Sequence, residues 1–158
     1  MLTFIKTTVD RSRHVLENLQ WSGPLLVRLT VGLVFVMTGW GKLHSLDNVT
    51  EFFQSLGIPA PGFHALVVSS VELVGGLMLI VGLGTRIASA LLIGVMAVAI
   101  WTAKLSEIHG LVDLANTIEF TYLAMFAWLL VQGPGAASID HVVARRTAAH
   151  REPDPIVA

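Results

Sequence analysis

Four long apolar stretches constrain the fold of this chain more than any other feature. They cover about residues 24–43, 63–83, 87–105 and 114–132. A helix of about 20 mostly apolar residues is long enough to cross a bilayer. Because a backbone in hydrocarbon must satisfy its own hydrogen bonds, each stretch is predicted to be α-helical. The sequence therefore predicts an all-α fold, a four-helix transmembrane bundle in a lipid bilayer.

Composition and charge agree with this fold class and exclude others. Charged residues make up only 13% of the chain, whereas ordinary soluble domains carry about 25%. The net charge of −1 provides no basic field, so we expect no nucleic-acid partner. The chain has no cysteine, which excludes disulfides and thiolate metal sites.

Three segments follow from the position of the apolar stretches. Residues 1–23 are a predicted cytoplasmic segment, either an amphipathic helix on the membrane surface or a frayed polar tail. Residues 24–132 form the four-span membrane domain. Residues 133–158 are a predicted cytoplasmic tail, in which Ser138 or Asp140 begins a short helix.

Basic residues near the span ends predict the orientation of the bundle. On one side there are only Lys42 and Lys104. Because basic residues collect on the cytoplasmic side, both termini are predicted to be cytoplasmic. The other side holds Lys6, Arg11, Arg13, Arg86, Arg145, Arg146 and Arg151.

A weak internal repeat relates the two halves of the membrane domain. The first stretch ends with Trp40-Gly41-Lys42-Leu43, and the third ends with Trp101 followed by Lys104-Leu105. Each is followed by a stretch with one glutamate, Glu72 or Glu119. The halves are either two copies of one helical hairpin, related by an axis along the membrane normal, or similar by chance.

Ionisable side chains within the apolar stretches are the strongest functional signal, because charges at this depth are rare in membrane helices. Helical spacing places Gly94, Trp101 and Lys104 on one side of the third stretch. The equivalent sides of the other stretches predict a polar chamber in the outer half of the bundle, with Arg28 below it. The candidate ligand-binding residues are Arg28, Lys42, Glu72, Trp101, Lys104, Glu119 and Tyr122.

Two interpretations of these charges remain open and are compatible with each other. In the first, Glu72 pairs with Lys42 or Arg28, and Glu119 pairs with Lys104, so that the pairs fix helix packing. In the second, the carboxylates bind a ligand or move a proton. The candidate catalytic residues are then Glu72, Glu119 and Lys42.

Metal ligation is a weaker interpretation. His44 and His109 lie in the predicted outer loops and are candidate metal ligands, but no tight ligand spacing surrounds them. Solvated loop histidines are the simpler interpretation. No histidine lies in the middle of a stretch, so axial ligation of a buried haem is not expected.

Several short motifs, in this order and spacing, resemble the DoxX family of bacterial membrane proteins, with its DoxD-like relatives. The resemblance covers about residues 24–142, and Ala136-Ala137 depart from the family's usual basic or aromatic residue. The matching residues are Arg28, Gly39-Trp40-Gly41-Lys42-Leu43, Glu72-Leu73-Val74-Gly75-Gly76, Gly82-Leu83-Gly84-Thr85-Arg86, Gly133-Pro134-Gly135, Ser138 and Asp140.

The resemblance implies a four-helix bundle in the bacterial cytoplasmic (inner) membrane. Some members of the family are similar to the small subunit of thiosulfate:quinone oxidoreductase, and others are associated with membrane oxidoreductase complexes that handle thiols and oxidative stress. It therefore implies a redox partner protein and a quinone as a candidate cofactor. The loops here hold no large soluble domain, so a thiosulfate site would require the partner.

Three functions compete at this point. The first is a subunit of a redox complex that contacts quinone, without independent catalysis; Trp101, Tyr122 and Phe126 would supply the aromatic surface and Glu72, Glu119 or Lys42 the proton. The second is a non-catalytic scaffold or assembly protein, whose partner is another protein or a second copy of this chain. The third is a small transporter or proton path.

Overall fold

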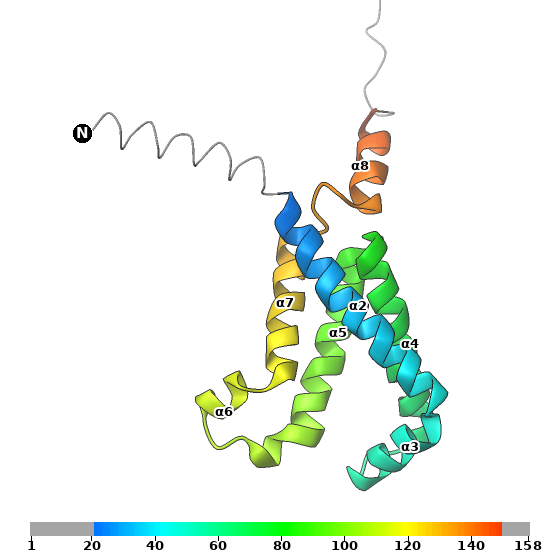
Figure 1. Ribbon diagram of the computed structural model, residues 1–158, viewed down its shortest axis with the longest axis vertical. Helices are drawn as coiled ribbons and strands as arrows, with labels where there is room; N and C mark the ends of the chain where they lie inside the picture. Colours follow the sequence, from blue (N-terminus) through cyan, green and yellow to red (C-terminus); the bar gives the residue numbers. More distant parts are fainter. Residues whose placement is uncertain (1–20, 150–158) are drawn as a thin grey trace, which may run out of the picture.

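The computed structural model describes residues 21–149, so the helix predicted at residues 2–20 lies outside the described part. Within residues 21–149 the chain is helical and contains no strand (Figure 1). This confirms the predicted all-α bundle. The elements are α2 (Ser22–His44), α3 (Leu46–Ser55), α4 (Pro61–Val81), α5 (Thr85–Ala99), the π-helical turn η1 (Ile100–Lys104), the 3₁₀ turn η2 (Leu105–Glu107), α6 (Leu111–Ala115), α7 (Ile118–Gln132) and α8 (Ile139–Ala149).

Three of the bundle helices are long enough to span a bilayer and the fourth is shorter. Helices α2 and α4 and the continuous helix Thr85–Glu107 have 21 to 23 residues each. Helix α7 has 15 residues, about 22 Å at 1.5 Å per residue. The predicted fourth span was wrong at its beginning, because the Thr117 side chain accepts a hydrogen bond from the Phe120 backbone N–H (3.3 Å) and caps α7 there.

Helices α2 and α4 approach each other closely enough for their backbones to touch. A Cβ atom added to Gly76 would lie 2.7 Å from the backbone nitrogen of Val36 and 2.8 Å from the carbonyl oxygen of Gly32. Gly39 makes the same kind of approach to Leu73 further along α2. Small residues permit this contact between membrane helices, so the glycines make α2 and α4 a tightly packed hairpin.

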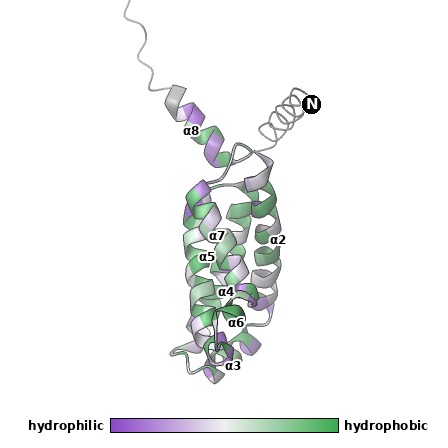
Figure 2. Cartoon of the chain, turned by 90° about the vertical axis from the view of Figure 1, so that its left-hand side faces the viewer, coloured by the Kyte–Doolittle hydropathy of each residue, from purple (hydrophilic) through white to green (hydrophobic). Residues whose placement is uncertain are grey.

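The second hairpin, α5 with α7, closes the core. Phe35 of α2 reaches across to it and packs edge-on against Tyr122 and Phe126, with ring centroids 5.3 and 5.0 Å apart. The middle of the bundle is hydrophobic and the charged residues collect toward its ends (Figure 2). The buried core consists of Val31, Phe35, Leu79, Ala88, Leu92, Met96, Phe126 and Leu129.

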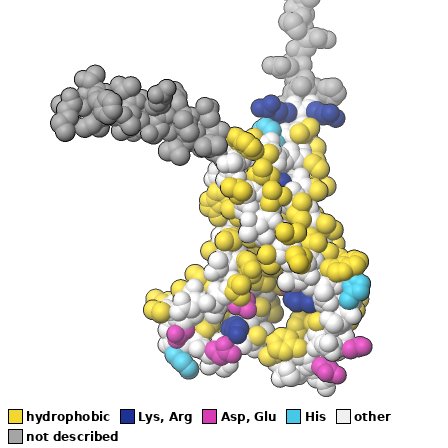
Figure 3. All heavy atoms as spheres, viewed as in Figure 1, with side chains coloured by type: hydrophobic (Ala, Val, Ile, Leu, Met, Phe, Trp, Pro, Cys, Tyr) yellow, Lys and Arg dark blue, Asp and Glu magenta, His cyan; other side chains and the backbone are white. Residues whose placement is uncertain are grey.

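The two ends of the bundle differ in shape. At one end, which we name the tail end, lie the beginning of α2, the end of α7 and α8 (Figure 1). At the opposite end, which we name the cavity end, α3 and α6 stand apart as two lobes with a hollow between them. Acidic and basic side chains gather around that hollow (Figure 3). Both ends of the described chain therefore lie on the same side of the bundle.

Candidate functional site

A cavity of about 650 Å³ opens at the cavity end, between α3 and α4 on one side and α5 with η1 on the other. This volume falls in the range of small-molecule sites, about 300–1,000 Å³. Its walls are mostly aliphatic and aromatic, with Phe52 and Phe53 contributed by α3. The ionisable residues in its lining are Lys42, His64, Glu72, Lys104, Glu107 and Glu119.

Two of the charged residues that line this cavity, Lys42 and Glu72, form an ion pair. Lys42 Nζ donates to Glu72 Oε1 over 2.6 Å, so one of the two predicted pairings of Glu72 is confirmed. Glu72 is 2% exposed and lies 11 residues from the first residue of α4, about 16 Å along the helix. Its second oxygen, Oε2, is buried and has no hydrogen-bond partner within the described residues. Only one of the two carboxylate oxygens of Glu72 is therefore hydrogen-bonded within the described residues.

The rim of the cavity carries a different ion pair from the one predicted. Lys104 Nζ donates to Glu107 Oε2 over 3.1 Å, and no ion pair joins Lys104 to Glu119 within residues 21–149. The 3₁₀ turn η2 continues the helix past Lys104, so Glu107 lies three residues on and within reach. Glu119 lines the cavity from the first turn of α7. Sequence reasoning missed Glu107 because it assigned that residue to a loop.

Trp101 does not line the cavity, contrary to its predicted place in the chamber. Its side chain is 72% exposed, whereas Gly94, Thr102 and Lys104 of the same continuous helix are lining residues. The π-helical turn at Ile100–Lys104 explains the difference, because its wider turn changes which residues share a face. The prediction assumed α-helical spacing throughout.

Tyr122 also lies outside the cavity lining. Its ring packs against Phe35 in the core, and Phe126 beside it is fully buried. The aromatic surface of the cavity comes instead from Phe52 and Phe53. A short surface helix was expected at about residues 48–56, close to α3, but its phenylalanines were not considered as part of a site.

Arg28 lies at the tail end and not beside Glu72, so the alternative pairing of Glu72 with Arg28 was wrong. Arg28 is 14 residues before Lys42 on α2, about 21 Å along the helix. The guanidinium is 1% exposed and donates four hydrogen bonds to main-chain carbonyl oxygens. Their acceptors and distances are Leu79 (2.8 Å), Ile80 (3.1 Å), Pro134 (2.6 Å) and Ala137 (3.0 Å).

Asp140 completes this tail-end network from the last described helix. Its carboxylate accepts hydrogen bonds from the backbone N–H groups of Gly84 (2.8 Å) and Thr85 (3.0 Å), the beginning of α5. Its own N–H donates to the carbonyl of Gly82 (3.0 Å). Gly82 and Gly84 have φ of +70° and +59°, a region that favours glycine. An aspartate distant in sequence therefore caps α5 and fixes the tail to the bundle.

Comparison with known proteins decides the family. The sequence profile of the DoxX family matches residues 23–105. The chain belongs to the DoxX family. This confirms the resemblance seen in the sequence, and the matched region contains Arg28, Lys42 and Glu72 but neither Glu119 nor Asp140.

Three curated proteins are similar to this DoxX chain over most of its length. "Putative oxidoreductase CatD" of Bacillus subtilis (strain 168) is 34% identical over 103 residues, 65% of this chain and 72% of CatD. "Uncharacterized membrane protein Rv3486" of Mycobacterium tuberculosis is 33% identical over 137 residues, 79% of this chain and 83% of the relative. "Inner membrane protein YqjF" of Escherichia coli (strain K12) is 26% identical over 131 residues, 83% of this chain and 99% of YqjF. No solved structure matches the chain.

The histidines of this DoxX chain are not gathered into a metal-ligand group. His44 Nδ1 lies 2.9 Å from the Trp40 carbonyl oxygen, and the His44 ring stacks against Trp40. The backbone N–H of His109 donates to Asp113 (3.0 Å). Within residues 21–149 no three His, Asp or Glu side chains lie close enough together to hold a metal ion.

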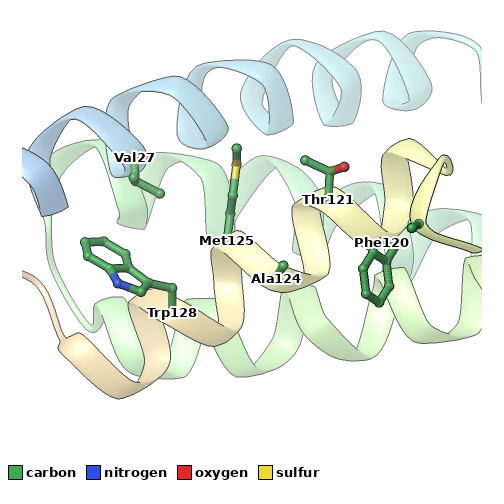
Figure 4. A pocket seen from close by; sticks show the side chains of 7 residues that line it. Val27, Phe120, Thr121, Ala124, Met125 and Trp128 are labelled. Carbon is green, nitrogen blue, oxygen red and sulfur yellow. The ribbon is translucent and has the colours of Figure 1, made fainter. Parts of the chain in front are cut away.

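A second pocket of about 430 Å³ lies between α2 and α7 and has a different character. Val27 lines it from α2, while Met125 and Trp128 line it from α7 (Figure 4). No ionisable side chain contributes to its lining. The DoxX chain thus combines one apolar crevice with one cavity that carries charged groups, and only the latter has groups able to exchange protons.

Proposed function

We propose that this DoxX family protein is a membrane subunit of an oxidoreductase complex and that its cavity binds the ring of a quinone. The observation that carries this proposal is the Lys42–Glu72 pair, a buried glutamate and a partly exposed lysine that both line a cavity with mostly apolar walls. The name of the relative CatD supports the association with an oxidoreductase. The proposed partners are the lipid bilayer and a redox protein of the complex.

The lining residues fit a quinone ring. Phe52, Phe53 and Val71 offer aromatic and aliphatic surface, and such apolar walls with a few polar groups are typical of small-molecule sites. Lys42 has three N–H donors, of which one is directed to Glu72. A bound quinone would supply two-electron chemistry coupled to protons, which this chain's own side chains do not carry.

The chain's own residues hold the ring oxygen and a proton in this proposal. Lys42 donates a hydrogen bond to the ring oxygen, and Glu72 positions the ammonium group through its 2.6 Å contact. The pair exchanges a proton with the ligand as a general acid and base. Glu107 and Glu119 at the rim connect the cavity to the solvent at the cavity end.

We infer that the protein lies in the bacterial cytoplasmic (inner) membrane with the tail end on the cytoplasmic side. The name of YqjF supports the location, and Arg86, Arg145 and Arg146 at the tail end support the orientation. A C-terminal fusion to green fluorescent protein should fluoresce, and a fusion to alkaline phosphatase should be inactive. The opposite pattern would reverse the orientation.

A glycine in the cavity wall allows a direct test of quinone binding. Gly94 lines the cavity, and a Cβ added to it would contact nothing within 4 Å. Gly94→Phe should therefore fill the cavity without disturbing the bundle. Gly41→Phe is the matched control, since Gly41 also has open space around it but lies outside the cavity lining.

The measurement is retention of decyl-ubiquinone by the purified protein in detergent, against protein-free micelles of the same composition. We expect wild type and Gly41→Phe to retain the quinone and Gly94→Phe to lose at least about tenfold in affinity, equal to about 1.4 kcal/mol. Equal retention by the two glycine variants would rule out this cavity as the site.

The subunit role has its own test. The protein should be purified from native membranes in mild detergent, and co-purifying proteins identified. We expect an oxidoreductase that reduces quinone, with slower turnover when the subunit carries Glu72→Gln and remains folded. Unchanged turnover in that variant would contradict a role for the cavity in the reaction.

A further inference from the structure

Helices α4 and α5 are in contact at one level of the bundle and diverge from there toward the cavity end (Figure 1). A Cβ atom added to Gly75 of α4 would lie 3.2 Å from the Leu92 side chain of α5, which is fully buried. One turn further toward the cavity end, Val71 of α4 and Val95 of α5 line the cavity. The cavity is therefore a wedge between two membrane-spanning helices, closed where Gly75 meets Leu92.

The wedge opens sideways on the outer face of α5. Leu91 and Val98 both line the cavity, yet they are 51% and 55% exposed. Gly94 lies between them in the lining and has no side chain to cover the opening. Helical spacing places all three on one stripe with Ile87, which is 65% exposed and outside the lining. Because this stripe belongs to a helix long enough to cross the bilayer, the opening faces hydrocarbon chains and not water.

The opening lies at the same level of the bundle as the Lys42–Glu72 pair. Gly75 and Leu92 mark one level on two antiparallel helices that are joined by a short turn. Glu72 is three residues from Gly75 toward the cavity end, and Val95 is three residues from Leu92 in the same direction. Both therefore lie about 4.5 Å beyond the contact, and Val95 falls between the two residues that border the opening. A ring held by Lys42 has the opening beside it, so that a substituent of the ring can leave sideways.

We infer that this opening is an entrance from the bilayer and that the quinone bound in the cavity carries a long hydrocarbon chain, which stays in the opening between α4 and α5. The apolar border, Leu91 and Val98, offers the chain contacts in which its surface remains out of water. A ligand that enters by this route passes from lipid to protein without crossing water. The inference rests on the proposed function, because it specifies the chemical class of the quinone proposed there and its route into the cavity.

The test compares decyl-ubiquinone with ubiquinone-0, which has the same ring without the chain. Val98→Trp places a bulky side chain in the opening. Ile87→Trp is the matched control, because it adds the same side chain to the same face of α5 but outside the cavity lining. Retention of each quinone by the purified variants in detergent is measured relative to wild type, against protein-free micelles. We expect Val98→Trp to weaken decyl-ubiquinone binding by at least about tenfold, the equivalent of roughly two methylene groups that are no longer buried. Both variants should bind ubiquinone-0 as wild type does.

Failure of this inference can be told apart from failure of the proposed function. If Val98→Trp retains decyl-ubiquinone as well as wild type does, or weakens both quinones equally, the entrance is overturned while quinone binding stands. The same conclusion follows if Ile87→Trp lowers the retention of decyl-ubiquinone as much as Val98→Trp does. If wild type retains neither quinone, both proposals are overturned. Leu91→Trp, at the other border of the opening, gives the same comparison if Val98→Trp fails to fold.

Discussion

Within residues 21–149, each end of the bundle buries one charged side chain, but the two differ in how fully their polar atoms are hydrogen-bonded. Arg28 at the tail end is 1% exposed and Glu72 at the cavity end is 2% exposed. Arg28 donates to four carbonyl oxygens, so its guanidinium is enclosed by acceptors. Glu72 has a single partner and one oxygen without any within the described residues.

This difference separates a charge that builds the fold from a charge available to a ligand. A buried charge is tolerated when hydrogen bonds replace the water it has lost. The tail end meets this condition with main-chain atoms of α4 and of residues 134–137, so Arg28 ties three parts of the chain together. The cavity end leaves part of the condition unmet, at a residue that lines the cavity. Depth in the membrane alone does not distinguish the two cases.

The largest effect is expected from Arg28→Met. The substitution leaves several buried carbonyl oxygens without donors, and we expect a loss of about 3–5 kcal/mol of stability, since each unsatisfied buried polar group costs about 1–3 kcal/mol. Thermal unfolding in detergent measures it. Arg86→Met is the control, since Arg86 is exposed and donates one long bond, 3.4 Å, to the Val131 carbonyl. Equal losses in both variants would mean that the tail-end network does not stabilise the bundle.

The second effect concerns two glycines, Gly76 in the contact between α2 and α4 and Gly94 in the cavity wall. Gly76→Val places atoms against the Val36 nitrogen and the Gly32 carbonyl, so α2 and α4 must separate, and we expect a loss of about 2 kcal/mol. Gly94→Val adds the same atoms where nothing lies within 4 Å and should leave unfolding almost unchanged. Thermal scans of both variants in one detergent decide the matter. A Gly94 variant as unstable as the Gly76 variant would argue against open space at Gly94.

Much of the fold was predictable because bilayer thickness fixes the length of an apolar helix. The bounds of α2 and α4 follow the apolar stretches closely. The fourth span was predicted to begin too early. Thr117 caps α7 through its side chain, and a hydropathy pattern does not show such a hydrogen bond. The close contact at Gly76 follows the general rule that small residues line helix interfaces, but the sequence does not say which helix Gly76 faces.

The site was less predictable because it depends on helix phase. The Lys42–Glu72 pair followed from depth and from the reach of a lysine side chain. Trp101 was assigned to the wrong side of its helix because nothing in the sequence of Ile100–Lys104 predicts a π-helical turn. The four carbonyl partners of Arg28 could not be predicted for another reason. Every residue has a backbone carbonyl, so the sequence does not show which carbonyls accept its hydrogen bonds.

The third effect tests whether the tail is fixed to the bundle. Asp140→Ala removes the cap of α5, and we expect a loss of about 1–2 kcal/mol, as for other N-cap substitutions. Asp113→Ala is the control at the cavity end, since Asp113 also accepts a backbone N–H, from His109, but at the exposed beginning of α6. Hydrogen exchange at Gly84 and Thr85 should rise only in the Asp140 variant. Unchanged exchange there would show that the cap is not formed in the membrane.

The smallest effect on stability is expected where the effect on binding is largest. The double variant Lys42→Met/Glu72→Leu replaces the half-satisfied pair with apolar side chains of similar size. Replacing a buried pair in this way is often neutral or stabilising, so we expect the midpoint of thermal unfolding to stay within the equivalent of about 1 kcal/mol. Retention of decyl-ubiquinone should nevertheless be lost, because the ring oxygen would no longer meet the Lys42 donor.

This double variant distinguishes the two ends more sharply than any single substitution. If it unfolds as readily as Arg28→Met, the cavity pair is a structural pair like the tail-end network, and the contrast between the ends disappears. If it stays folded and still retains the quinone, the ligand is held by the apolar walls alone. Only a stable protein that no longer binds the ring agrees with a pair kept for its chemistry, at a position where the bundle does not need a charge.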